Sequence, residues 1–167
     1  MRKRIDRKTK VADAVKYYGA DIIYSDKFKR SHKNMQHGDV SVMDHSISVS
    51  MMSVRLAKLT HLKYDYYSLV RGSLLHDYFL YDWHDKDKSH RLHGFRHADT
   101  ALTNAADDFS INPIEANMIA RHMFPLNIRP PRTREAIILC IADKICAAKE
   151  TVSKPFYNKS IKKIHDK

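Results

Sequence analysis

The chain has 167 residues, which is enough for one domain with its own hydrophobic core. Only 4 Gly and 5 Pro occur among them, and this composition favours helices over a turn-rich β fold. The net charge is +11, and no apolar stretch has the length of a signal-peptide core or a membrane span, so we expect a soluble cytoplasmic protein without a membrane partner.

The basic excess lies at the two ends of the chain. Residues 1–36 contain 11 Lys or Arg and 4 Asp or Glu, residues 149–167 contain 6 and 2, and the segment between them has 13 of each and is neutral. We therefore expect a basic helix and loop at 1–36, part of or packed on the domain, a metal-binding helical domain at 37–152 and a basic tail at 153–167. Because Met1–Lys10 has no interleaved aromatic residues, we assign the ends to solubility or weak substrate steering in preference to nucleic-acid binding.

The chain begins with a predicted amphipathic helix and a polar loop. Val11–Lys29 forms the helix, whose apolar residues at helical spacing are Val15, Tyr18 and Ile22. Residues 30–39 are polar and irregular, and they predict a loop.

The second predicted helix brings a histidine to the core. Asp44 has the position of an N-cap, and the helix runs to about His61. Its apolar stripe is Val49, Met52, Leu56 and Leu59. One turn before Val49 the stripe reaches His45, which we therefore expect to face the core.

The third predicted helix, Tyr64–Tyr81, carries His76 and Asp77 side by side in an apolar run. Burying two such groups is costly unless they find a partner, and a metal ion accepts both imidazole and carboxylate. The other interpretation is a hydrogen-bonded core histidine beside a surface aspartate. The charged residues 82–94 follow, and we expect an exposed loop over the site that includes His93.

Three further helices are predicted in the second half. Phe95–Phe109 places His97, Ala101 and Ala105 in one row, and Asn112-Pro113-Ile114-Glu115 has the residues of a helix start. The face of that next helix carries Ile114, Glu115, Met118, Ile119 and His122. The last helix runs from about Arg132 to Thr151, with Asp143 directly after its most apolar stretch. Its Cys140 and Cys146 lie about 9 Å apart on a helix, too far for a disulfide.

Five predicted helices thus each bring polar groups to an apolar face, namely His45, His76 with Asp77, His97, His122 and Asp143. Six such groups are enough for one divalent metal ion, or for two with a bridging carboxylate. Imidazole and carboxylate without thiolate suit Fe, Mn²⁺ or Zn²⁺, with Mg²⁺ and Ni²⁺ as further options. We expect an all-α, single-domain bundle of five to seven helices with this site in its middle.

The order of these residues resembles the HD-domain superfamily of metal-dependent phosphohydrolases. The resemblance covers about residues 40–150 and rests on Asp44-His45-Ser46, His76-Asp77, Ile119-Ala120-Arg121-His122 and Ala142-Asp143-Lys144. It implies that His45, His76, Asp77 and Asp143 bind a first metal ion, and that Asp77 bridges to a second ion completed by His97 and His122. It gives the catalytic role to His76 and Asp77.

One position departs from the family pattern. Many members continue His-Asp with Ile-Gly-Lys, whose lysine handles phosphate, whereas this chain continues with Tyr78-Phe79-Leu80. Other residues must then contact the substrate, and the candidates are Lys144, Arg96, Arg121, Trp83 and His84, with Asp82 and Lys88 as further loop candidates. Stacking of a base on Tyr78, Tyr81 or Trp83 makes a nucleotide our first choice of substrate, although all three are also candidates for packing.

These observations predict a phosphomonoesterase or phosphodiesterase that acts on a nucleotide or a similar small phosphorylated metabolite. Two alternatives stay open: a non-catalytic HD domain that binds a nucleotide or nucleic acid as a sensor, and a dinuclear-metal oxygenase. The complete ligand set favours the enzyme, whereas the missing lysine and the basic ends keep the sensor open. The sequence leaves the metal, the substrate and the oligomeric state undetermined.

Overall fold

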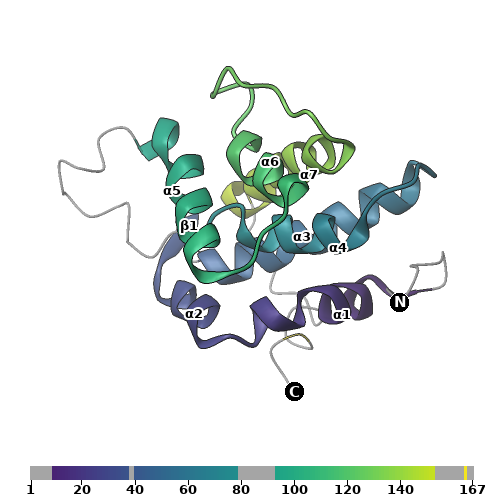
Figure 1. The fold of residues 1–167 in the computed structure, drawn as a ribbon, viewed down its shortest axis with the longest axis horizontal. Coiled ribbons are helices and arrows are strands. Elements are labelled where there is room, and N and C mark those ends of the chain that lie inside the picture. Colours follow the sequence, from purple (N-terminus) through teal and green to yellow (C-terminus); the bar gives the residue numbers. More distant parts are fainter. Residues whose placement is uncertain (1–8, 38–39, 79–92, 153–163, 165–167) are drawn as a thin grey trace.

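The computed structural model describes residues 9–37, 40–78, 93–152 and 164. Within these ranges the chain forms seven α-helices, a 3-10 helix and one short antiparallel hairpin, which confirms the predicted all-α class (Figure 1). In chain order the elements are α1 (Val11–Ile23), α2 (Asp26–Lys29), η1 (Arg30–Lys33), β1 (Met35–His37), β2 (Val40–Ser41), α3 (Val42–Leu59), α4 (Tyr66–Leu75), α5 (His93–Asp108), α6 (Pro113–Arg121) and α7 (Arg134–Val152).

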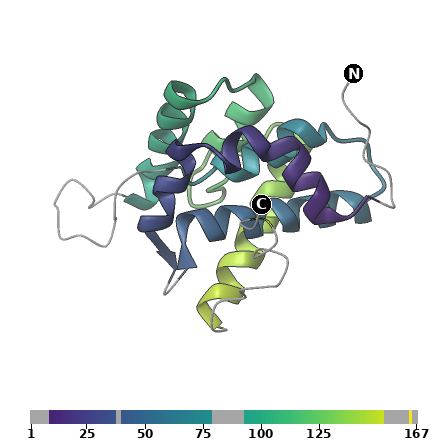
Figure 2. The ribbon, with the colours of Figure 1, turned by 90° about the horizontal axis from the view of Figure 1, so that it is seen from below.

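Helices α3 and α4 run side by side through the middle of the molecule, and the other long helices pack around them (Figure 1). Helix α1 contacts both of them and faces the viewer in Figure 2, where α7 crosses α3. Helices α6 and α7 contact each other and α4, and α5 packs on α6. None of the described helices is long and apolar enough to cross a membrane.

Two clusters of buried apolar side chains lie on either side of the central helices. The first joins α1, α3, α4 and α5 and includes Ile22, Ile47 and Leu74. The second joins α3, α4, α6 and α7 and includes Met118 and Leu139. From the segment predicted as a basic tail, the structure describes Ile164, which is buried in the first cluster.

The first predicted helix is divided in two. Its inward residues Val15, Tyr18 and Ile22 are buried as predicted. Ser25, however, has an extended backbone, and its Oγ accepts a hydrogen bond from the Phe28 N–H, so it ends the first helix and caps α2. The predicted loop at 30–39 also contains η1 and the strand β1, which pairs with β2.

Helix α3 starts three residues earlier than predicted, because Ser41 and not Asp44 is its N-cap. Ser41 Oγ accepts from the Asp44 N–H at 3.1 Å and donates to Asp44 Oδ2 at 2.7 Å. His45 and Val49 are fully buried as predicted, but Leu59 is 72% exposed.

The inner face of α3 continues through small polar residues that hydropathy does not mark. Ser50 Oγ donates to the Val70 carbonyl, and Ser73 Oγ donates to Ser53 Oγ, so hydroxyl groups pair across the contact between α3 and α4. Small side chains that satisfy one another allow these helices to approach closely. The predicted apolar stripe was wrong at its C-terminal end, where Leu59 is exposed.

Helix α4 is shorter than predicted. Asp65 caps it, and it ends at Leu75, so His76 occupies the C-cap and Asp77 lies in the turn that follows. The two residues therefore lie at the end of a helix and not within it. Leu80 and Tyr81, which were predicted in this helix, and Asp82 and Lys88 of the predicted loop lie outside the described residues.

The helix starts in the second half are closer to the prediction. Asn112 and Glu115 form a complete capping box at the start of α6, as predicted. Helix α5 begins at His93, so this residue belongs to the helix and not to the preceding loop, although Gly94 follows it.

Candidate metal centre

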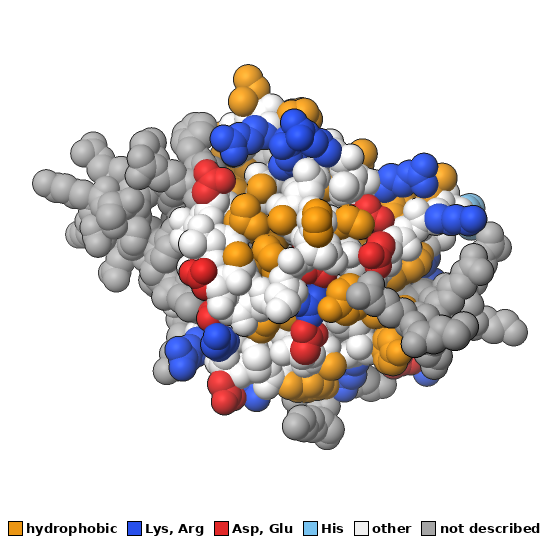
Figure 3. All heavy atoms as spheres, viewed as in Figure 1, with side chains coloured by type: hydrophobic (Ala, Val, Ile, Leu, Met, Phe, Trp, Pro, Cys, Tyr) orange, Lys and Arg blue, Asp and Glu red, His pale blue; other side chains and the backbone are white. Residues whose placement is uncertain are grey.

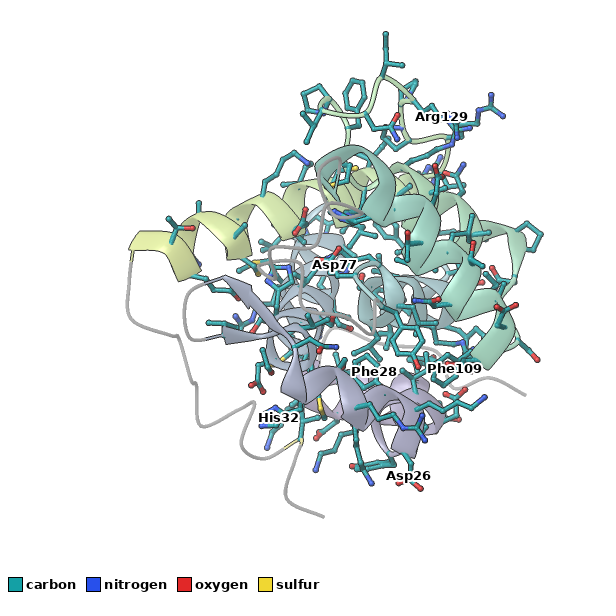
Figure 4. All side chains as sticks on the ribbon, turned by 90° about the vertical axis from the view of Figure 1, so that its left-hand side faces the viewer. Asp26, Phe28, His32, Asp77, Phe109 and Arg129 are labelled. Atoms are coloured by element: carbon teal, nitrogen blue, oxygen red, sulfur yellow. The ribbon has the colours of Figure 1, made fainter. Side chains whose placement is uncertain are left out.

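Five helices bring the six predicted ligands to one place in the interior. Each side chain sits at or near a helix end or on an inward face, and all are buried except for a small part of Asp143. Figure 4 shows Asp77 inside the molecule, between α7 and the helices around it. The ligands come from α3 (His45), the end of α4 (His76 and Asp77), α5 (His97), the end of α6 (His122) and α7 (Asp143).

The first group of ligand atoms surrounds one carboxylate oxygen of Asp77. Asp77 Oδ2 lies 3.3 Å from His76 Nε2 and 3.6 Å from His45 Nε2. Asp143 Oδ1 lies 3.2 Å from His45 Nε2 and 3.6 Å from His76 Nε2. Two imidazole nitrogens and two carboxylate oxygens thus converge.

The second group surrounds the other oxygen of the same carboxylate. Asp77 Oδ1 lies 3.0 Å from His97 Nε2 and 3.1 Å from His122 Nε2, and these nitrogens are 2.8 Å apart. Each oxygen of Asp77 therefore belongs to a different group.

Hydrogen bonds on the opposite side of the rings fix which nitrogen faces the site. His76 Nδ1 donates to the Ser73 carbonyl, and His122 Nδ1 donates to the Ile119 carbonyl, both at 2.8 Å. A carbonyl oxygen only accepts, so each Nδ1 carries the hydrogen and each Nε2 of a neutral ring presents a lone pair. This is the tautomer that a metal site needs.

The resulting arrangement needs a positive charge in its middle. Lone pairs on nitrogen that face carboxylate oxygens repel them unless a proton or a cation lies between. Among the described residues, the buried Nε2 of His76 finds no hydrogen-bond partner of good geometry. Ligands on an octahedral ion with bonds of about 2.1 Å are about 3 Å apart. The spacing is 2.8–3.1 Å in the second group and slightly wider, 3.2–3.6 Å, in the first. The residues present therefore fit a divalent cation.

The pKa values of His45, His76 and Asp143 also indicate that the site favours a positive charge. Burial alone would lower the pKa of His76, but Asp77 and Asp143 outweigh it and raise this pKa to about 10. Burial would also lower the pKa of His45, but Asp143 and Glu150 outweigh it and raise this pKa to about 9. The neighbouring histidines hold the pKa of Asp143 below its usual range despite burial. Carboxylates that raise the pKa of neighbouring imidazoles this strongly will also attract a metal ion.

Residues 42–148 match the model of the HD domain. This chain belongs to the HD-domain family. The match spans all six predicted ligands and helices α3 to α6, with most of α7. Comparisons with curated proteins and with solved structures gave no match. HD domains are generally metal-dependent hydrolases, and the buried His/Asp cluster of this one could hold a divalent metal.

Of the predicted substrate-binding residues, the structure describes the side chains of Lys144 and Arg121. Lys144 Nζ donates to the carbonyls of His122 and Cys140, so it closes the end of α6. Arg121 donates to the Pro130 carbonyl on the surface. Trp83 and His84, and the side chain of Arg96, lie outside the described part of the chain.

Tyr78, one of the aromatic candidates for base stacking, is a packing residue. Its ring is fully buried, with Phe28 stacked at 6.2 Å and Phe109 edge-on at 5.4 Å between centroids. Its hydroxyl donates to Asp108. Figure 4 shows Phe28 and Phe109 near each other, away from Asp77. Tyr78 therefore packs in the core directly after Asp77 and does not offer a face to a base.

Sequence reasoning missed Glu150, which accepts a hydrogen bond from His45 Nδ1 at 2.7 Å. Its side chain is only 5% exposed. Glu150 lies seven residues, or two helical turns, after Asp143, so the two share a face of α7. That spacing was the available signal.

Proposed function

We propose that this HD domain is a metal-dependent hydrolase of phosphate esters that acts on a nucleotide or a similar small phosphorylated metabolite. The observation that supports the proposal best is the position of Asp77, whose two oxygens each join a different group of histidines. One carboxylate shared in this way suits two cations side by side, an arrangement used to clamp both oxygens of a phosphoryl displacement.

The six ligands and their supports have distinct parts in this proposal. Ions held by these side chains would activate water near neutral pH and would neutralise the charge that develops on the phosphoryl group. The carbonyls of Ser73 and Ile119 hold the rings of His76 and His122 in orientation. Burial keeps bulk water from the ligands, which strengthens every electrostatic interaction in the site.

The proposal of a nucleotide has less support than the proposal of hydrolysis. With Tyr78 used in packing, it depends on Tyr81 and Trp83, which follow the His-Asp pair closely in sequence. A cytoplasmic location is supported by Cys140 and Cys146, both buried and free.

Binding of nucleic acid is the less favoured proposal. On the face drawn in Figure 3, the described basic side chains are interspersed with acidic ones and do not form a continuous strip. The basic excess belongs to the two ends of the chain, as the sequence shows.

The test is a panel of phosphate esters assayed with metal-stripped protein reloaded with Mn²⁺, Fe²⁺, Zn²⁺, Mg²⁺ or Ni²⁺ in turn. The panel contains nucleoside mono-, di- and triphosphates, cyclic and dinucleotides, and sugar phosphates, with release of phosphate or nucleotide measured. We expect metal-dependent hydrolysis of at least one nucleotide class by the wild type and none by Asp77→Asn prepared identically. Metal binding without hydrolysis of any ester would favour the sensor, and oxygen consumption with turnover would favour the oxygenase.

A further inference from the structure

We infer that Glu150 is a positioning residue that orients His45 as a ligand and raises the affinity of the first group for its metal ion. The inference rests on the proposed metal site and adds a residue that lies beyond the part of the chain matched by the HD-domain model. Glu150 acts through His45 and does not itself join either ligand group.

The geometry assigns the hydrogen on His45. A carboxylate only accepts hydrogen bonds, so the 2.7 Å contact with Glu150 Oε2 places the hydrogen on Nδ1 of His45. The other nitrogen, Nε2, then faces Asp143 Oδ1 at 3.2 Å and Asp77 Oδ2 at 3.6 Å. Glu150 thus turns the metal-binding nitrogen of His45 toward the site.

His45 differs in this respect from His76 and His122. Those two rings are held by backbone carbonyls three residues earlier in their own helices. His45 on α3 is held by a side chain from α7, the same helix that contributes Asp143. Glu150 and Asp143, two turns apart on α7, therefore contact the two nitrogens of the His45 imidazole. These contacts fix α3 against α7 at the site.

The charge of Glu150 has its own effect. A carboxylate behind a ligating histidine makes the ring a stronger electron donor than a neutral carbonyl does. It also adds a third buried negative charge, after Asp77 and Asp143, next to the first group. Loss of such an outer partner typically weakens metal binding by about 10- to 100-fold.

A purely structural role makes a different prediction. If Glu150 served only to satisfy a buried histidine and hold the end of α7, its removal would lower the melting temperature without changing the affinity of the folded protein for metal. A matched control is available on the same helix. Glu135 is also a buried carboxylate of α7, and it accepts from the Asp65 N–H at 2.9 Å, outside both ligand groups.

The experiment measures Mn²⁺ dissociation constants and the number of bound ions for the wild type, Glu150→Gln, Glu150→Ala and Glu135→Gln, each shown to be folded by circular dichroism. We expect one of the two Mn²⁺ sites, the one that His45 belongs to, to weaken by about 10- to 100-fold in Glu150→Ala and by less in Glu150→Gln, which keeps an acceptor oxygen but loses the charge. The second site and Glu135→Gln should match the wild type. If Glu150→Ala does not fold, the comparison of Glu150→Gln with Glu135→Gln decides.

Three results would overturn the inference, and they are distinguishable. Normal Mn²⁺ binding by the wild type together with unchanged binding by the folded Glu150 variants would overturn the role of Glu150 alone. Equal weakening in Glu135→Gln would do the same, since it would show a general effect of losing a buried carboxylate from α7. No Mn²⁺ binding by the wild type would overturn the proposed metal site itself, and the inference with it.

Discussion

Arg71 Nε donates to Glu115 Oε1 over 3.1 Å, and both side chains are buried between α4 and α6. The same guanidinium donates to the carboxylate of Asp21 and to the carbonyl of Ser110. Arg71 thus ties α4 to α1 and to the turn before α6. Asp77, six residues later, meets histidines instead. Within the described part of the chain, the buried Glu115 therefore has an arginine as its structural partner, whereas the buried Asp77 lies in a site suited to a cation.

Replacing Asp77 by Asn should abolish metal binding at both groups together. The change keeps the volume of the side chain but removes the one negative charge that both groups share. We expect metal content near zero by elemental analysis and no effect of added metal on the melting temperature. Full metal occupancy in Asp77→Asn would refute the bridging role.

The matched control for this experiment is Glu115→Gln. It removes the buried carboxylate partner of the Arg71 guanidinium and leaves the more exposed Asp21 as its carboxylate partner, which should lower the free energy of unfolding by about 1–3 kcal/mol. Metal content should stay at the wild-type value, because Glu115 belongs to neither ligand group.

Replacing His97 by Ala should remove one metal ion and leave the other. His97 contributes to the second group only, whereas the atoms of the first group come from His45, His76, Asp77 and Asp143. A Mn²⁺ titration should therefore show one fewer bound ion with the affinity of the remaining ion preserved. The exposed His32 provides a control, since His32→Ala should leave the stoichiometry unchanged. Loss of all metal from His97→Ala would contradict two separable groups.

Metal should stabilise the fold, because a site assembled from five helices does not exist in the unfolded chain. At a free metal concentration of 100 times Kd, the free energy of unfolding should rise by about 2.7 kcal/mol. Differential scanning calorimetry after chelation, and again after addition of Mn²⁺ or Fe²⁺, measures the effect. Identical melting curves would count against the site.

As pH rises, the stability of the metal-free protein should fall, whereas its affinity for metal should rise. Folding raises the pKa of His45 to about 9 and of His76 to about 10, so the folded chain without metal binds protons more tightly than the unfolded chain. The stability from these groups is fully present below the unfolded pKa of 6.5 and is lost as pH rises through the folded values.

The melting temperature of the chelated protein should therefore fall as pH rises from 6.5 toward 9. The increase in melting temperature caused by metal should grow over the same range, because metal must displace those protons. Melting curves with and without Mn²⁺ across this range measure both trends. Parallel curves would show that the histidines do not exchange protons for metal.

Replacing Gly19 by Ala should destabilise the protein although Ala is the better helix former. A Cβ at this position would lie 2.4 Å from Leu74 Cδ1, because α1 and α4 approach each other closely here. The gain in helix propensity is about 1 kcal/mol, and overpacking a core costs about 1–3 kcal/mol. Urea denaturation should show a net loss of stability with unchanged metal content, and a gain would mean that Leu74 moves aside freely.

Much of the fold was determined by local sequence. The spacing of Val15, Tyr18 and Ile22 and the capping box of Asn112 and Glu115 specify helices without help from distant residues, because periodicity and caps act over one or two turns. The six candidate ligands could be found in the same way, as polar groups on apolar helix faces, and the structure brings all six together. What sequence alone determined about this protein is therefore its helical class and the set of candidate ligands.

Only the tertiary structure decided how these groups meet. Contacts between different helices divide the two Asp77 oxygens between two groups, join Glu150 to His45 and place Lys144 at the end of α6. The serine face of α3 is buried because it matches hydroxyls and carbonyls on α4, and hydropathy does not encode that match. Such contacts depend on how whole helices pack, whereas a local pattern reports only which face of each helix turns inward.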